Sequence, residues 1–202
     1  MRCTWAWAFL AWSISAFPVQ AHSPVPGIEG FYVGLLHPFS TPAQALLMIG
    51  LGLFVAGLEQ AHMRNVFSAF FITMLVGILP GIWIAEPDAA MFGVAMAVCA
   101  LAALWPGTPL PLALALIALG GLFMGQVSIP DPGPERDRII TMSGSFVGAN
   151  IGLLYVAGGV FFLKERYPQQ WLQIGFRVAA AWLGAISLVM LALSFATDGT
   201  PT

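Results

Sequence analysis

The feature that most constrains this chain is an apolar stretch, residues 30–58, that Pro38 and Pro42 interrupt. Proline lacks a backbone N–H, and hydrocarbon offers no hydrogen-bonding partner to the backbone groups that a break in a helix leaves free. Such a break is tolerated at membrane depth only where protein or a wet cavity surrounds it. The stretch therefore predicts a membrane protein whose first segment is broken inside a bundle of helices.

The composition agrees with a membrane protein. Of the 202 residues, 59% are hydrophobic and 8% are charged, and the mean hydropathy is +0.88, so charged side chains are too few to cover a soluble surface. The net charge of −2, with no basic cluster, gives no reason to expect nucleic acid as a partner. No arrangement of nucleophile, base and acid indicates an enzyme, and no motif indicates a resident cofactor.

The sequence also predicts where the broken segment becomes helical. Thr41 can cap a helix and Pro42 suits its first position, so we expect a helix from Pro42 to about Leu58. His37 would then lie in a non-helical segment that faces the interior of the bundle. A re-entrant piece over residues 30–36 can precede it.

Residues 1–21 resemble a secretory signal peptide. Arg2 gives a positive start, an apolar core follows, and V-Q-A before His22 matches a cleavage site. The alternative is an uncleaved membrane helix, but the core is short for a span of about 20 residues. We predict cleavage after Ala21. His22 would then carry a free amine beside its imidazole and could chelate copper, nickel or zinc, the alternative being a disordered tail.

The predicted fold is an all-α integral membrane protein, in which a six-helix transmembrane bundle follows the signal peptide as a single domain, residues 22–202. Each apolar segment is near the length that a helix needs to cross hydrocarbon. The predicted spans are about 42–58, 66–85, 89–105, 110–129, 139–163 and 171–196.

The distribution of basic residues predicts the orientation in a bacterial inner membrane. With six crossings, both ends of the mature chain would face the periplasm. The cytoplasmic side would then hold most of the basic residues, namely Arg64, Lys164, Arg166 and Arg177. The periplasmic side would hold Arg136 and Arg138 beside acidic neighbours in a loop that is either a solvated linker or an acidic lip that gathers cations.

Small residues predict how the helices pack. Gly144, Gly148 and Gly152 recur at every fourth position, as do Gly121 and Gly125 in the preceding span. Such spacing lets helix backbones approach closely, which matters because lipid provides no hydrophobic push between helices. We therefore predict that spans 110–129 and 139–163 pack against each other along these faces.

The segment H-P-F-S-T-P-A-Q-A-L-L-M-I-G-L-G-L, which begins at His37, resembles the first membrane helix of the HupE/UreJ family. These are small multi-pass membrane proteins linked to nickel supply for hydrogenase and urease. The family pattern is H-x5-D-H followed by an apolar helix that contains Met and Gly. His37 matches the first histidine, whereas Ala43 and Gln44 stand at the positions of the aspartate and the second histidine.

A second family motif, F-H-G-x-A-H-G-x-E, corresponds to F-M-G-Q-V-S-I-P-D from Phe123 to Asp131. Its Phe and Gly are kept. Met124 and Ser128 stand where the family has histidines, and Asp131 stands where it has glutamate. The frame of the motif is thus present with other side chains at the ligand positions.

The resemblance implies a metal route lined by soft and polar groups. The expected metal ligands are His37, His22, Gln44, Met124 and Asp131, and the expected cavity-lining residues are Met48, Gln126 and Asn150. The family implies nickel, whereas Met with His suits Cu(I) better. Met is equally an ordinary core residue, and Asn150 can instead hydrogen-bond between helices.

Two functions follow from this resemblance. The first is a permease that passes a transition-metal ion (nickel, or else copper or cobalt) by facilitated diffusion, with the lipid bilayer and the ion as its partners. The second is an accessory or assembly protein that keeps the scaffold without the ligands and binds another membrane protein.

Overall fold

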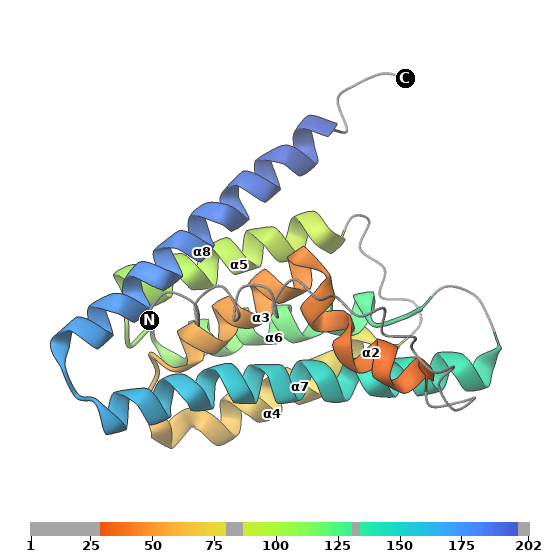
Figure 1. The fold of residues 1–202 in the computed structure, drawn as a ribbon, viewed down its shortest axis with the longest axis horizontal. Helices are drawn as coiled ribbons and strands as arrows, with labels where there is room; N and C mark the ends of the chain where they lie inside the picture. Colours follow the sequence, from red (N-terminus) through yellow and green to blue (C-terminus); the bar gives the residue numbers. More distant parts are fainter. Residues whose placement is uncertain (1–28, 80–86, 131–133, 198–202) are drawn as a thin grey trace, which may run out of the picture.

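The computed structural model describes residues 29–79, 87–130 and 134–197, so the predicted signal peptide and the cleavage after Ala21 lie outside the described residues. Within these ranges the chain is helical and contains no strand (Figure 1). The elements are α2 (Glu29–Ser40), α3 (Pro42–Val55), the short 3-10 helix η1 (Gln60–His62), α4 (Met63–Gly77), α5 (Pro87–Leu104), α6 (Leu110–Val127), α7 (Glu135–Arg166) and α8 (Gln170–Thr197).

The helix lengths confirm an all-α multi-pass membrane protein. Helices α5, α6, α7 and α8 are each long and apolar enough to cross a bilayer, and α2 with α3 makes a fifth span if the bent pair is counted as one. Helix α4 begins at Met63, just before the second predicted span, and ends at Gly77. The remaining crossing stays a prediction, because residues 80–86 lie outside the described ranges.

The first span is bent by 71° between α2 and α3. The structure confirms that a helix starts at Pro42, but it shows that His37 lies in the last turn of α2, so the predicted non-helical segment is wrong. Pro38 lies inside α2, two residues before the helix ends, and its missing N–H removes one backbone hydrogen bond from that helix. The hydroxyls of Ser40 and Thr41 donate to the His37 carbonyl at 3.1 and 3.2 Å, and Thr41 therefore gives α3 no side-chain cap.

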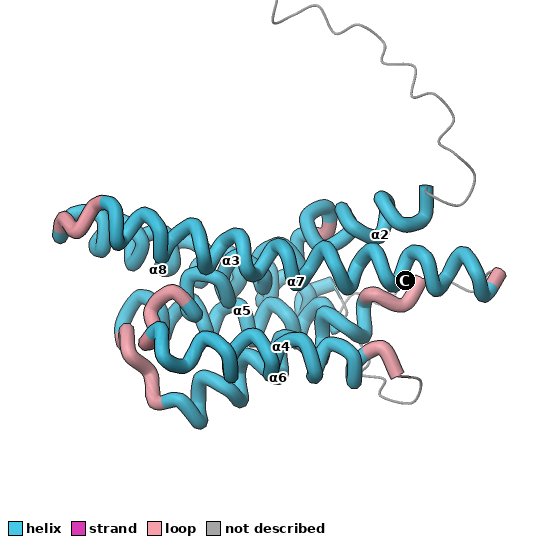
Figure 2. Tube along the Cα trace, turned by 90° about the horizontal axis from the view of Figure 1, so that it is seen from below, coloured by secondary structure: helices cyan, strands magenta, loops and turns pink. Residues whose placement is uncertain are grey.

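Helix α3 is the central element of the bundle. It contacts α2, α5, α6, α7 and α8, and Figure 1 shows it between α5 and α7, while Figure 2 gives a second view of the same bundle. Its side chains form the middle of the apolar core, in which Leu47, Met48, Leu51 and Phe54 are almost fully buried. Helix α8 is different: it packs mainly on α5 and diverges from the bundle toward its C-terminal end (Figure 1).

The glycine stripes do make close helix contacts, but their partners differ from the prediction. Gly121 and Gly125 of α6 lie against the backbone of α4 at Phe70 and Met74, and Gly77 of α4 completes the contact. The extensively packed helix pairs are α2 with α7, α4 with α6 and α5 with α8, so the predicted pairing of α6 with α7 is wrong. The stripe signals a close approach of two backbones, but it carries no information about which helix approaches.

The stripe on α7 contacts the N-terminal part of the chain. A Cβ added at Gly144 or Gly148 would meet the backbone of α2 at Phe31 or Leu35, and one added at Gly152 would meet the sulfur of Met48 in α3. Helix α2 therefore lies directly on α7 (Figure 1). This contact determines where the last turn of α2, with His37, is placed.

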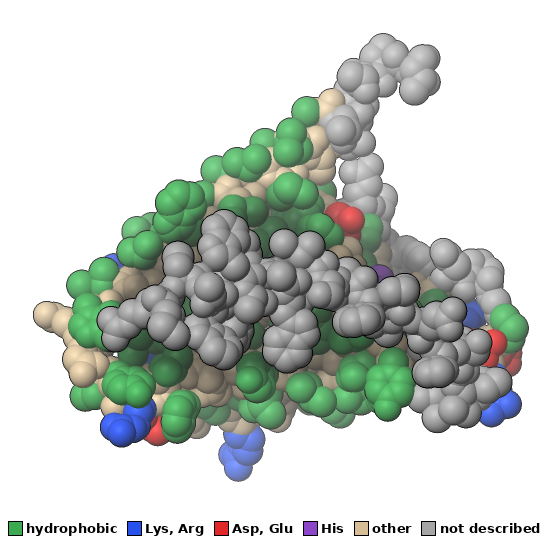
Figure 3. All heavy atoms as spheres, viewed as in Figure 1, with side chains coloured by type: hydrophobic (Ala, Val, Ile, Leu, Met, Phe, Trp, Pro, Cys, Tyr) green, Lys and Arg blue, Asp and Glu red, His purple; other side chains and the backbone are tan. Residues whose placement is uncertain are grey.

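Charged side chains separate toward the two ends of the bundle. Among the described residues that are visible in Figure 3, apolar side chains predominate along the middle, and most of the Lys and Arg side chains lie toward the ends of the long axis. One end holds Lys164 and Arg166 at the end of α7, and the other holds Glu135 and Asp137 with Arg136 and Arg138 at its start. This pattern fits a helix bundle whose middle faces hydrocarbon.

We expect Gly148→Leu to lower the thermal unfolding temperature of the detergent-solubilised protein. Its side chain would collide with the backbone of α2, and such overpacking costs about 1–3 kcal/mol. Gly158→Leu on the same helix is the matched control, because a Cβ there meets nothing within 4 Å. Equal unfolding temperatures for the two variants would show that the α2–α7 contact is not required for stability.

A histidine-lined cavity between α2, α6 and α7

A cavity of about 360 Å³ lies between α2, the C-terminal end of α6 and the first half of α7. We refer to it as the histidine cavity. It joins the two segments that carry the sequence motifs, since α2 ends at the first and α6 ends in the second. Its lining residues are Val33, His37, Val127, Ser128, Ile129, Pro130, Thr141 and Ser145.

His37 contributes the imidazole of this cavity. It belongs to the last turn of α2 and is partly exposed, so the ring is neither sealed in the core nor fully open. Three hydroxyl-bearing residues share the lining with it, namely Ser128, Thr141 and Ser145. An imidazole nitrogen with nearby oxygen atoms suits a divalent transition-metal ion, although hydroxyls are weaker ligands than carboxylates.

The hydroxyl groups of the lining differ in how they are satisfied. Ser128 donates to the carbonyl of Met124 at 2.6 Å, a bond within its own helix end. Ser145 is 1% exposed, and its Oγ has no hydrogen-bond partner among the described residues. A buried polar atom without a partner is costly and uncommon, and it often marks a place where water or an ion binds.

The other predicted residues lie elsewhere in the described structure. Met48 and Met124 are buried in the apolar core, and Gln126 is buried at the end of α6. The amide of Asn150 donates to the Phe146 carbonyl within α7 at 2.8 Å and to the sulfur of Met74 in α4 at 3.6 Å. Of the predicted ligands, only His37 lines the histidine cavity, and His22 and Asp131 lie outside the described residues.

Gln44 is the second polar group whose environment is unusual. It sits in the first turn of α3, beyond the bend from His37, and is only 2% exposed. Its Oε1 atom has no hydrogen-bond partner among the described residues. An unpaired amide oxygen inside an apolar core is expensive, so Gln44 is a candidate for contact with a passing ion or with water.

Thr141 and Ser145 were not among the residues that the sequence indicated. They are four residues apart on α7, hence on one face of the helix, and they border the glycine stripe that packs on α2. Hydroxyls beside such a stripe could have been recognised as interior, but the helix opposite them could not. Among the described residues, no three His, Cys, Asp or Glu side chains gather into a metal-binding group.

A family model described as "HupE / UreJ protein" matches residues 10–190. The chain belongs to the HupE/UreJ family. This family consists of membrane proteins related to nickel or cobalt transport, and its members are transporters or accessory proteins. No curated protein and no solved structure matches this HupE/UreJ protein. The resemblance seen at His37 and at Phe123–Asp131 is thereby confirmed at the level of the family.

We expect Gln44→Met to raise the free energy of unfolding by about 1 kcal/mol, because it removes a buried amide oxygen that has no partner and keeps the volume of the side chain. Thermal unfolding in detergent checks this. Gln60→Met is the control, since the Gln60 amide is exposed and donates to Glu165 at 2.9 Å. A loss of stability specific to Gln44→Met would mean that the amide is satisfied in the folded protein.

Proposed function

We propose that this protein is an inner-membrane permease that passes a transition-metal ion by facilitated diffusion. The observation that supports it best is the position of His37, whose imidazole lines a cavity together with three hydroxyl-bearing residues from α6 and α7. The family, as a group related to nickel or cobalt transport, makes a divalent transition metal the first candidate for the ion. Nickel is our primary proposal, with cobalt or copper as the alternatives.

The weakness of the site is consistent with transport rather than storage. Conduction requires a site favourable enough for the ion to enter and weak enough for it to leave. One imidazole with hydroxyl oxygens meets this condition better than a complete set of histidines and carboxylates would. The route we propose runs from the histidine cavity past the bend to the buried oxygen of Gln44, with Met48 and Met124 as soft neighbours in the core.

The capture of the ion outside this cavity remains a proposal from the sequence. His22, as the mature N-terminus, and Asp131, directly after the cavity residue Pro130, are the candidates for first contact with the ion. Cleavage after Ala21 would place His22 on the periplasmic side. In the orientation we propose, six crossings leave both mature termini in the periplasm and the end with Lys164 and Arg166 in the cytoplasm.

The second candidate function is that of an accessory protein that binds a membrane partner. It is favoured by the residues at the family's ligand positions: Ala43 and Met124 are buried in the apolar core at 1% exposure, so neither side chain lines the histidine cavity. A scaffold could retain these residues for packing alone. Neither candidate function includes a catalytic role.

We expect whole cells that express His37→Ala to accumulate less nickel than cells that express the wild type, with a loss of about tenfold if the imidazole is the main ligand. His62→Ala is the matched control, because His62 lies at the opposite end of the bundle, beside Glu59 at 4.0 Å. Uptake of nickel, cobalt and copper measured by metal analysis, at equal protein levels in the membrane, gives the comparison.

Two results would decide against transport through this cavity. If the wild type raises the uptake of none of the three metals, the accessory function is favoured. If the wild type transports and both histidine variants retain full uptake, the ion takes another route through the bundle.

A further inference from the structure

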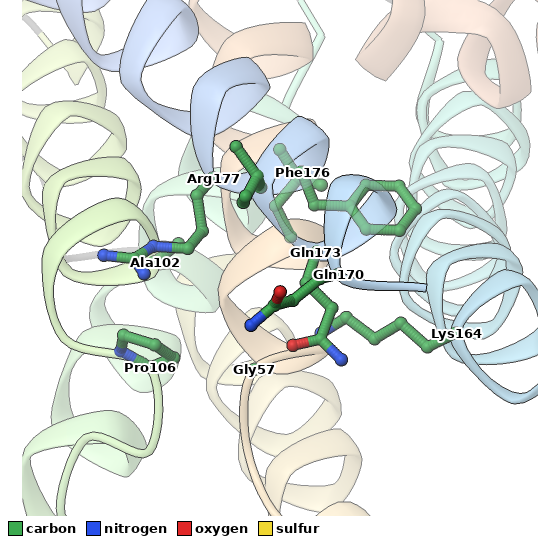
Figure 4. Close-up of a pocket in the computed structure, with 10 residues that line it drawn as sticks. Gly57, Ala102, Pro106, Lys164, Gln170, Gln173, Phe176 and Arg177 are labelled. Atoms are coloured by element: carbon green, nitrogen blue, oxygen red, sulfur yellow. The ribbon is translucent and has the colours of Figure 1, made fainter. Parts of the chain in front are cut away.

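A second cavity, also of about 360 Å³, lies at the end of the bundle opposite to His37, where α3, α5 and α7 end and α8 begins. Two cationic side chains line it, Lys164 from α7 and Arg177 from α8, together with the amides of Gln170 and Gln173. We refer to it as the basic cavity. Figure 4 shows Lys164 and Arg177 entering from different helices, with the two amides between them.

Both cations are anchored by the ends of neighbouring helices. The Lys164 ammonium donates to the carbonyl of Ala56 after α3 at 2.7 Å, and the Arg177 Nε donates to the carbonyl of Ala103 in the last turn of α5 at 2.6 Å. The Arg177 guanidinium is therefore held against the end of α5. These bonds hold both side chains at the cavity and leave further N–H groups of each cation for another acceptor.

The positive charge of this cavity is only partly offset. Among the described residues, neither Lys164 nor Arg177 forms a salt bridge with a carboxylate. The C-terminal ends of α3, α5 and α7 each contribute about half a negative charge, and the N-terminal end of α8 contributes about half a positive one. A net positive charge remains in a cavity whose lining also includes the apolar side chains of Phe176 and Ile174.

The surroundings favour a lipid over a soluble anion. Directly beyond the cavity, α8 presents the exposed apolar side chains of Ile174, Val178 and Trp182, and Trp171 is exposed at the start of the helix. An aromatic side chain at the end of a span is typical of the membrane–water interface. An acyl chain could therefore lie along α8 while its headgroup occupies the basic cavity, and basic pockets between membrane helices are known to bind acidic headgroups.

We propose that the basic cavity binds the phosphate of an anionic phospholipid, which Lys164 and Arg177 contact while Gln170 and Gln173 donate further hydrogen bonds. This lipid would join α7 and α8 at the end of the bundle where α8 begins. The site is separate from the histidine cavity and does not depend on the proposed transport.

The test is the retention of phosphatidylglycerol against phosphatidylcholine by the purified full chain, released from nanodiscs that contain equal amounts of the two and measured by native mass spectrometry. We expect the wild type to retain phosphatidylglycerol preferentially. Arg177→Gln and Lys164→Gln should each reduce this preference about fivefold, the effect of one basic residue near an anionic surface. Arg166→Gln, which removes the same charge from the same end without lining the cavity, should leave the preference unchanged.

Three outcomes would overturn the proposal: no preference in the wild type, an equal loss in the Arg166→Gln control, or complete displacement of phosphatidylglycerol by inorganic phosphate at millimolar concentration. The last would identify the ligand as soluble phosphate. Arg177→Lys keeps the charge and should retain the preference, which separates loss of binding from loss of folding. Nickel uptake by the same variants should stay unchanged, so this test and that of His37 can fail independently.

Discussion

The backbone contact between α2 and α7 is the interaction on which the rest of this structure depends. Gly144 and Gly148 allow α7 to touch the α2 backbone, and Gly34 of α2 allows the same from the other side. In lipid, where apolar surface provides no preference between helices, such close contact is a main source of association. It fixes α2 at a sharp angle to α3 and thereby sets His37 against the end of α6.

The polar atoms inside the bundle have a common explanation in the proposed function. Ser145 and Gln44 each bury an oxygen that has no partner among the described residues, a cost that a purely structural bundle could avoid with apolar side chains. Both lie near the bend, one on α7 and one at the start of α3. Ala43 stands where the family has an aspartate and Met124 where it has a histidine. Ser145 and Gln44 nevertheless keep polar atoms inside the bundle.

The two cavities lie at opposite ends of the bundle and differ in the chemistry of their lining residues. The histidine cavity has a partly exposed imidazole and hydroxyls, suited to a cation that stays briefly. The basic cavity holds Lys164 and Arg177 where helix ends meet, suited to an anion that stays longer. The helices between them are apolar and tightly packed around α3, so an ion moving between the two ends would pass an apolar core in which Gln44 is one of the few buried polar residues among those described.

The local structure of the chain was predictable from the sequence, whereas the pairing of one helix with another was not. The lengths of the apolar segments predicted the long helices, and Pro42 predicted the start of α3. The motifs at His37 and at Phe123–Asp131 indicated the family. Each of these features depends only on residues that are neighbours in the sequence. The helical state of His37 was not predictable in this way, because a residue that precedes a proline is disfavoured in a helix, yet α2 continues through Pro38 to Ser40. Only the tertiary structure decided that α7 packs on α2 and α6 on α4, and that Thr141 and Ser145 line the same cavity as His37. The physical reason is that a stripe of small residues fits any close backbone, so its partner is selected by the packing of the whole bundle.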